Sequence, residues 1–266
     1  MIGADFAAAL QPSLIMEEAG LPADPWQAEL LDAWPPPKRA VIVASRQAGK
    51  STTVAAVALH EALFGPPDGL VAIVSPSQPQ SSEMARRVLA LLGSLDPAPA
   101  LDQVAVTSFT VAATGTRVLS LPGSAETIRG YSASLLVIDE AAFVADDVMA
   151  AARPMLAATG GRLVALSTPA GRRGWFADAV LGNDPQWHRV SVTAADCPRL
   201  TPEFLEAERR ALGDRRFRQE YLGEFTGTTN AVFTADTIDT MTDPTGDVLW
   251  GGRNPFDIPT TPGPRA

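Results

Sequence analysis

One short stretch constrains the fold of this chain more than any other: Ala44-Ser45-Arg46-Gln47-Ala48-Gly49-Lys50-Ser51. It follows an apolar run at 40–44 and opens a helix-like run at 51–64. A strand, a loop that ends in Gly-Lys-Ser and a helix form the Walker A arrangement, here with an alanine in place of the first glycine. Backbone N–H groups of such a loop, together with the helix N-terminus, surround a nucleotide β-phosphate. The stretch therefore predicts a P-loop nucleotide-binding fold.

The side chains of this loop predict separate roles in binding ATP and Mg²⁺. Lys50, one of only two lysines, supplies a charge to the β and γ phosphates, and Ser51 offers a hydroxyl to Mg²⁺. The alternative is a chance match to a short pattern, against which the flanking strand and helix argue. The expected ATP-binding residues of the loop are Ser45, Arg46, Gln47, Ala48, Gly49, Lys50, Ser51 and Thr52.

A second apolar run, at 135–138, ends in two acids, which is a Walker B pattern. We expect Asp139 to hold Mg²⁺ mostly through water, and Glu140 to polarise the attacking water as general base. The alternative is that the two acids cap the following helix. Ser167 and Thr168 end a later strand and are expected to sense the γ-phosphate, although hydroxyls at strand ends are more often turn residues.

Apolar runs alternate with helical stretches along the middle of the chain, which is typical of an α/β protein with a mostly parallel sheet flanked by helices. Residues 201–225 carry charges of both signs and predict a small helical lid. A short helix capped by Asp24 is expected where Pro25-Trp26-Gln27 leads to the apolar Leu30 and Leu31. The other expected helices are 51–64, 81–92 and 146–158, and the expected strands are 40–44, 70–75, 104–111, 117–121, 134–138, 162–167 and 187–192.

Charge divides the chain into four expected parts. Residues 1–37 have six acids and no Lys or Arg, the core (38–200) and lid (201–233) are together neutral, and 234–266 form an acidic, disordered tail. The net charge is −9, and even the neutral middle of the chain shows no basic DNA-binding domain. Contacts with DNA are therefore expected to be local or shared with another chain. No apolar run approaches the roughly 20 residues of a membrane span.

Taken in order, these motifs resemble the ATPase domain of phage terminase large subunits, a RecA-like (ASCE) P-loop NTPase. The resemblance covers about 24–233. It rests on Pro25-Trp26-Gln27, Ser45-Arg46-Gln47-Ala48-Gly49-Lys50-Ser51, Ile128-Arg129-Gly130-Tyr131, Ile138-Asp139-Glu140-Ala141-Ala142-Phe143, the coupling motif Leu166-Ser167-Thr168-Pro169, and Phe217-Arg218-Gln219-Glu220-Tyr221-Leu222-Gly223-Glu224-Phe225.

The resemblance implies further roles. Gln27 would read the adenine, and Arg129 or Arg46 would be the arginine finger, with Arg129 acting on the ATP of a neighbouring subunit in a ring. The alternatives are a polar helix residue for Gln27 and surface salt bridges for the arginines. The implied cofactors are ATP and Mg²⁺. The implied partners are double-stranded DNA, the terminase small subunit and the procapsid portal protein. The implied location is the host cytoplasm, and the chain is expected to be a monomer in isolation and a homo-oligomeric ring on the portal.

The chain departs from the family at its C-terminal end. Family members usually carry an RNase H-like nuclease domain, but only 19 residues follow Asp247. We therefore expect an ATPase part without nuclease activity of its own, which couples ATP hydrolysis to DNA translocation. The alternatives are a remnant ATP-binding or scaffold module of a split terminase, and a helicase-like DNA-dependent ATPase. Helicases of that kind generally need two RecA-like domains.

Overall fold

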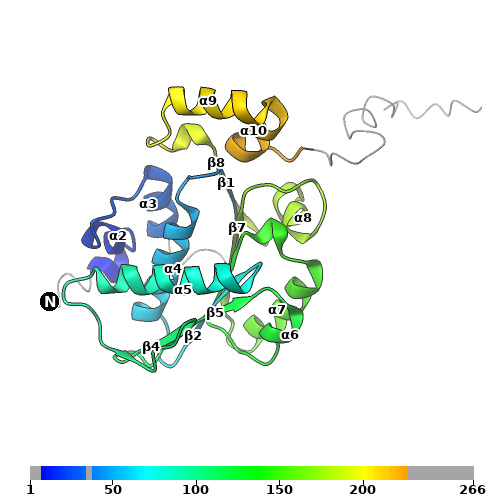
Figure 1. Cartoon of the computed structure of the whole chain (residues 1–266). Coiled ribbons are helices and arrows are strands. Elements are labelled where there is room, and N and C mark those ends of the chain that lie inside the picture. Colours follow the sequence, from blue (N-terminus) through cyan, green and yellow to red (C-terminus); the bar gives the residue numbers. More distant parts are fainter. Residues whose placement is uncertain (1–6, 34–37, 227–266) are drawn as a thin grey trace, which may run out of the picture. The chain divides into compact units, whose positions relative to one another are not determined.

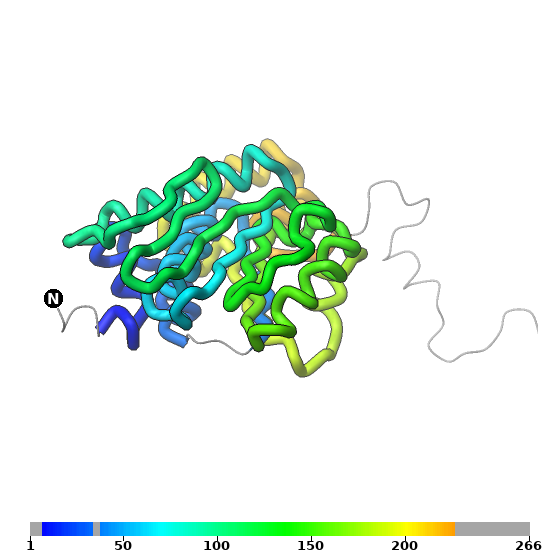
Figure 2. The backbone as a smooth tube through the Cα atoms, turned by 90° about the horizontal axis from the view of Figure 1, so that it is seen from below, coloured from blue at the N-terminus to red at the C-terminus, as the bar shows by residue number. Residues whose placement is uncertain are grey.

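The computed structural model describes residues 7–33 and 38–226, which belong to one compact unit, Met1–Thr226. A second unit, Gly227–Ala266, lies outside the described residues, and so does the expected acidic tail. Figure 1 shows a central sheet with helices on both of its faces. In Figure 2, the N-terminal helices and the segment around residues 140–180 lie on opposite sides of that sheet.

The sheet has eight strands in the order β3-β4-β5-β2-β6-β7-β1-β8. All pairs from β5 to β8 are parallel, whereas β3 and β4 add an antiparallel edge. This confirms the expected α/β class with a mostly parallel sheet. The strands are β1 Arg39–Ala44, β2 Leu70–Ser75, β3 Leu101–Asp102, β4 Ser108–Val111, β5 Arg117–Pro122, β6 Leu135–Asp139, β7 Arg162–Ser167 and β8 His188–Val192.

Side chains of the central strands alternate between two apolar cores, one on each face of the sheet. In β1, Ile42 packs into one core, and its neighbours Val41 and Val43 pack into the other. Burial on both faces explains why these strands appear in the sequence as continuous apolar runs. One face carries α2 Leu14–Glu18, α3 Pro25–Asp32, α4 Lys50–Phe64 and α5 Gln78–Gly93, and the other carries α6 Ala125–Ile128, α7 Asp146–Ala157 and α8 Trp175–Leu181.

The expected lid is helical, but it consists of two helices, α9 Pro202–Leu212 and α10 Asp214–Leu222. Gly213 separates them because its φ of 77° takes the backbone out of the helical region. A small third core, in which Phe217 and Tyr221 are buried, holds the pair together. This core also includes Ala194 of the 3₁₀ turn Ala194–Asp196, which follows β8.

Most expected elements are present with small shifts at their ends, and the strands at 70–75 and 162–167 are confirmed at both ends. The sequence prediction missed β3, α2, α6 and α8. Each of these has seven residues or fewer, which is too short for a hydrophobic period to stand out.

Candidate functional site

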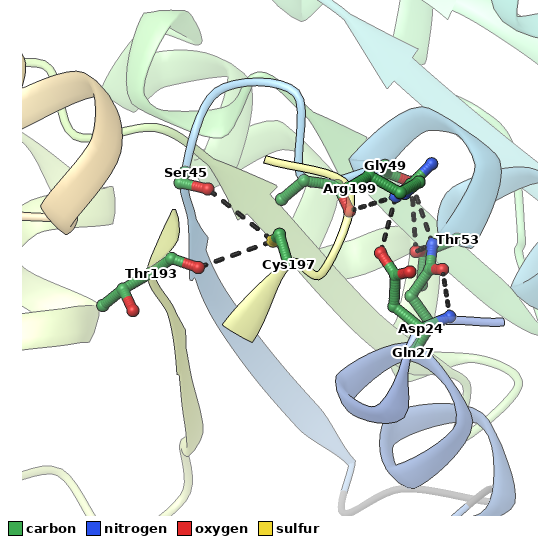
Figure 3. Close-up of polar contacts among 9 residues, drawn as sticks. Asp24, Gln27, Ser45, Gly49, Thr53, Thr193, Cys197 and Arg199 are labelled. Carbon is green, nitrogen blue, oxygen red and sulfur yellow. Dashed lines mark hydrogen bonds and ion pairs between the residues drawn. The ribbon is translucent and has the colours of Figure 1, made fainter. Parts of the chain in front are cut away.

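The predicted phosphate loop leads from the end of β1 into the first turn of α4 (Figure 3). Gln47 and Gly49 have positive φ values of 60° and 92°. A Cβ on Gly49 would lie 2.9 Å from Arg199 Nη2 and 2.9 Å from Gln27 Nε2. Glycine therefore suits this position both for its backbone conformation and for the space it leaves to two neighbouring side chains.

The Lys50 side chain lies inside this loop. Its Nζ donates to the carbonyl oxygens of Ser45 at 3.1 Å and Ala44 at 3.4 Å. Burial lowers the pKa of Lys50, and the carboxylates of Glu140 and Asp139 act in the opposite direction. The loop lysine and the two predicted acids therefore share one electrostatic environment.

The two acids lie at the end of β6. Asp139 is buried, its Oδ1 accepts the backbone N–H of Glu140 at 3.0 Å, and burial together with the charge of Glu140 raises its pKa to about 6. Glu140 makes no side-chain cap to the turn that follows it, and α7 begins after Ala145. The alternative that these acids are helix caps is therefore wrong.

Ser167 connects the acids to the strand beside them. Because β7 pairs with both β1 and β6, its end lies between the phosphate loop and the acids. Ser167 Oγ donates to Glu140 Oε2 at 3.2 Å, and Thr168 beside it is also buried. The hydroxyl of Ser167 therefore orients a carboxylate, rather than making a turn.

Gln27 lies against the phosphate loop, with all of its amide atoms in use. Its Oε1 accepts the backbone N–H of Asp24 at 2.9 Å, and its Nε2 donates to Thr53 Oγ1 at 2.8 Å and to the Gly49 carbonyl at 3.3 Å. In this arrangement Gln27 links α3 to the loop. The second lone pair of Oε1 can still accept an adenine N–H, whereas Nε2 can donate to the base only in exchange for one of its two bonds. The role of Gln27 in reading adenine stays a prediction.

The two candidate arginine fingers differ in position. Arg46 is exposed on the loop, and its backbone N–H donates to the Glu220 carbonyl at 2.6 Å. Burial is the main cause that lowers the pKa of Lys50, and the positive charge of Arg46 lowers it further by a smaller amount. Arg129 is exposed just after α6. Within 7–33 and 38–226, neither guanidinium has a salt bridge, so the salt-bridge alternative has no support there.

The sequence analysis missed one cluster at this site. Arg199 Nη2 lies 2.6 Å from Asp24 Oδ2 and 3.3 Å from the Ala48 carbonyl oxygen, and Cys197 Sγ lies 4.0 Å from Ser45 Oγ (Figure 3). Asp24 and Arg199 are 175 positions apart. No local pattern connects residues at that separation.

The residues present fit Mg²⁺. The Ser51 hydroxyl and the Asp139 carboxylate are the hard oxygen donors that this ion prefers. In the described part of the chain, no three His, Cys, Asp or Glu side chains gather into a metal cluster.

The strand order and the loop define a P-loop protein of the RecA-like class. Residues 41–240 match the family model of the terminase large subunit, T4-like-virus type, N-terminal part. The chain therefore belongs to the terminase large-subunit family, and it corresponds to the N-terminal ATPase domain of those proteins. No curated protein sequence matches it.

Solved structures agree with this assignment. Two structures of the ATPase domain of the Thermus phage P74-26 large terminase are each 25% identical to this chain, with TM-scores of 0.69 and 0.68. The matched region spans 81% of this chain and 100% and 99% of the two phage chains. The large terminase of bacteriophage HK97 is 17% identical over 81% of this chain, with a TM-score of 0.66. The chain spans only 55% of that protein. Over the described residues, no helix is long and apolar enough to cross a bilayer.

Proposed function

We propose that this protein is the Mg²⁺-dependent ATPase of a viral DNA-packaging motor, which couples ATP hydrolysis to the movement of double-stranded DNA into a procapsid. One observation carries the proposal. The Glu140 carboxylate accepts the Ser167 hydroxyl, and its negative charge acts to raise the pKa of the loop lysine, Lys50. A general base and a phosphate-binding cation thus share one site, as ATP hydrolysis requires.

The loop residues bind the substrate. Backbone N–H groups near the end of the loop surround the β-phosphate, whereas those of Ser45 and Arg46 donate to the carbonyls of Val192 and Glu220. The Lys50 ammonium leaves its two loop carbonyls to contact the β and γ phosphates. Ser51 and Asp139 would hold Mg²⁺, and the bound ion would supply positive charge that offsets the charge of the phosphates. When the Gln27 amide exchanges one of its present hydrogen bonds, it can form a hydrogen bond with the adenine base.

Glu140 holds the attacking water and takes its proton. The hydrogen bond from the Ser167 hydroxyl fixes the orientation of the Glu140 carboxylate. This bond weakens when Glu140 takes the proton, because a neutral carboxyl group is a weaker acceptor than a carboxylate. Ser167 ends the strand between the loop and the base, and Thr168 follows it. We propose that this pair couples the state of the γ-phosphate to the rest of the domain.

The motor role requires partners. We infer double-stranded DNA, a terminase small subunit and a portal protein, with several copies of this chain forming a ring in the host cytoplasm. An exposed basic turn, Arg172-Arg173, begins five residues after the end of β7 and offers a local contact to DNA phosphates. A remnant that only binds ATP is the second candidate, and it would bind ATP without releasing phosphate.

Replacement of Ser167 by Ala tests how Glu140 is oriented. We expect ATP turnover to fall about tenfold, because an unfixed carboxylate aligns the water less often. The affinity for ATP should change by less than about twofold, because Ser167 contacts the base and not the loop. The control is Ser120→Ala, which removes a buried hydroxyl that has no hydrogen bond. Equal turnover in Ser167→Ala and the parent would contradict the orienting role.

A mixing experiment tests whether Arg129 acts on a neighbouring subunit. Arg129→Ala and Glu140→Gln should each be inactive alone. In a mixed ring, some interfaces pair an intact Glu140 with an intact neighbouring Arg129, so part of the activity should return. The measurement is phosphate release at increasing protein concentration, which also favours assembly. Full activity of Arg129→Ala alone would move the finger role to Arg46, and no recovery in a verified mixed ring would favour action within one subunit.

A further inference from the structure

The segment that leads from β8 into α9 borders the phosphate loop at two points (Figure 3). Cys197 Sγ is 4.0 Å from Ser45 Oγ, near the start of the loop. Arg199 Nη2 is 3.3 Å from the Ala48 carbonyl oxygen, near its end. The base of the helical subdomain is therefore in direct contact with the part of the chain that receives the phosphates.

Arg199 also joins this loop to α3. Its Nη2 lies 2.6 Å from Oδ2 of Asp24, the residue that precedes α3. The Asp24 side chain is only 9% exposed, whereas that of Arg199 is 59% exposed. A carboxylate with so little contact with water needs a partner, and a negative charge at the edge of a phosphate site opposes ATP binding. Arg199 neutralises that charge.

The loop is shaped to admit this guanidinium. A Cβ on Gly49 would lie 2.9 Å from Arg199 Nη2, so any other residue there would move the guanidinium away from its present position. The glycine of the Walker A motif thus makes room for an arginine on the far side of the loop, in addition to allowing close approach of the phosphates.

We propose that Arg199 is a positioning residue of the ATP site. It holds the Ala48 carbonyl and the Asp24 carboxylate on the outside of the loop, so that the loop N–H groups stay directed inward toward the phosphates. The proposal rests on the proposed ATPase function and deepens it. Because Arg199 touches the binding loop and not the reacting atoms, it acts on ATP affinity and KM and leaves kcat unchanged.

The test measures ATP binding by calorimetry, and KM and kcat by phosphate release. Arg199→Ala should weaken ATP binding and raise KM by about tenfold or more, the scale of a lost charge-assisted hydrogen bond, with kcat within about twofold of the parent. Arg199→Lys should fall between the two, because lysine keeps the charge but not the planar fork. Adding Asp24→Asn to Arg199→Ala should restore at least about half of the lost affinity on a logarithmic scale, because the uncompensated charge is then gone.

The matched control is Arg210→Ala, which removes an exposed arginine of α9 and should change neither affinity nor kcat. Unchanged ATP affinity in Arg199→Ala, with or without a lower melting temperature, would overturn the proposal, and so would the absence of recovery in the double variant. If Arg199→Ala does not fold, Arg199→Lys carries the test, and parental affinity in that variant overturns the proposal. A parent that does not bind ATP would contradict the proposed function itself, which separates the two failures.

Discussion

Replacing Lys50 by Ala should weaken ATP binding at least about 100-fold, equivalent to about 2.7 kcal/mol, because several charge-assisted bonds to the phosphates are lost together. The Lys50 ammonium lies inside the loop, where it donates to the carbonyls of Ala44 and Ser45. Its removal also leaves the charges of Asp139 and Glu140 unbalanced beside the incoming phosphates. Titration calorimetry with ATP and Mg²⁺ measures the loss.

The matched control is Lys38→Ala. Lys38 is the only other lysine, is exposed, and precedes β1 at the end of the strand away from the loop. This variant should bind ATP like the parent. Equal ATP affinity in Lys50→Ala and Lys38→Ala would remove the assignment of the loop as the phosphate-binding site.

Replacing Glu140 by Gln should lower ATP turnover by at least about 100-fold while ATP binding is retained, because an amide cannot take the proton of the attacking water. The side chain keeps its size, and its amide oxygen still accepts the Ser167 hydroxyl that now holds the carboxylate. The variant therefore changes the proton transfer and leaves the position of the side chain alone. Binding by calorimetry and single-turnover phosphate release separate the two effects.

Glu126→Gln serves as the control, because Glu126 is an exposed acid on α6 with no salt bridge within the described ranges. It should turn over ATP at the parental rate. If Glu140→Gln retained parental turnover, another group would position the water, and Glu140 would have a structural role.

The sequence predicted the parts of this site that local patterns encode. The loop from Ser45 to Ser51 and the acids at the end of β6 have fixed spacing along the chain, and parallel strands bring their carboxyl ends to one edge of the sheet. The strand order that places Ser167 between them could not be predicted, because any crossover of similar length is compatible with the same runs of residues.

Contacts between distant segments were the hardest part to predict. The sequence assigned Gln27 to adenine, but its amide oxygen accepts from Asp24, at the start of the same helix, and its amide nitrogen donates to Thr53 and the Gly49 carbonyl, at the start of α4. Arg199 had no motif at all, and its partner Asp24 was interpreted only as a helix cap. These interactions depend on tertiary packing of α3 and the helical subdomain around the loop, which carries no periodic or spacing signal.

The most direct test of the account is phosphate release from ATP by the purified protein in Mg²⁺, with and without linear double-stranded DNA. A packaging ATPase should turn over ATP, turn it over faster as protein concentration rises or when DNA is added, and lose this activity in both Lys50→Ala and Glu140→Gln. A protein that binds ATP but releases no phosphate under any of these conditions, or whose phosphate release survives both substitutions, would contradict the account.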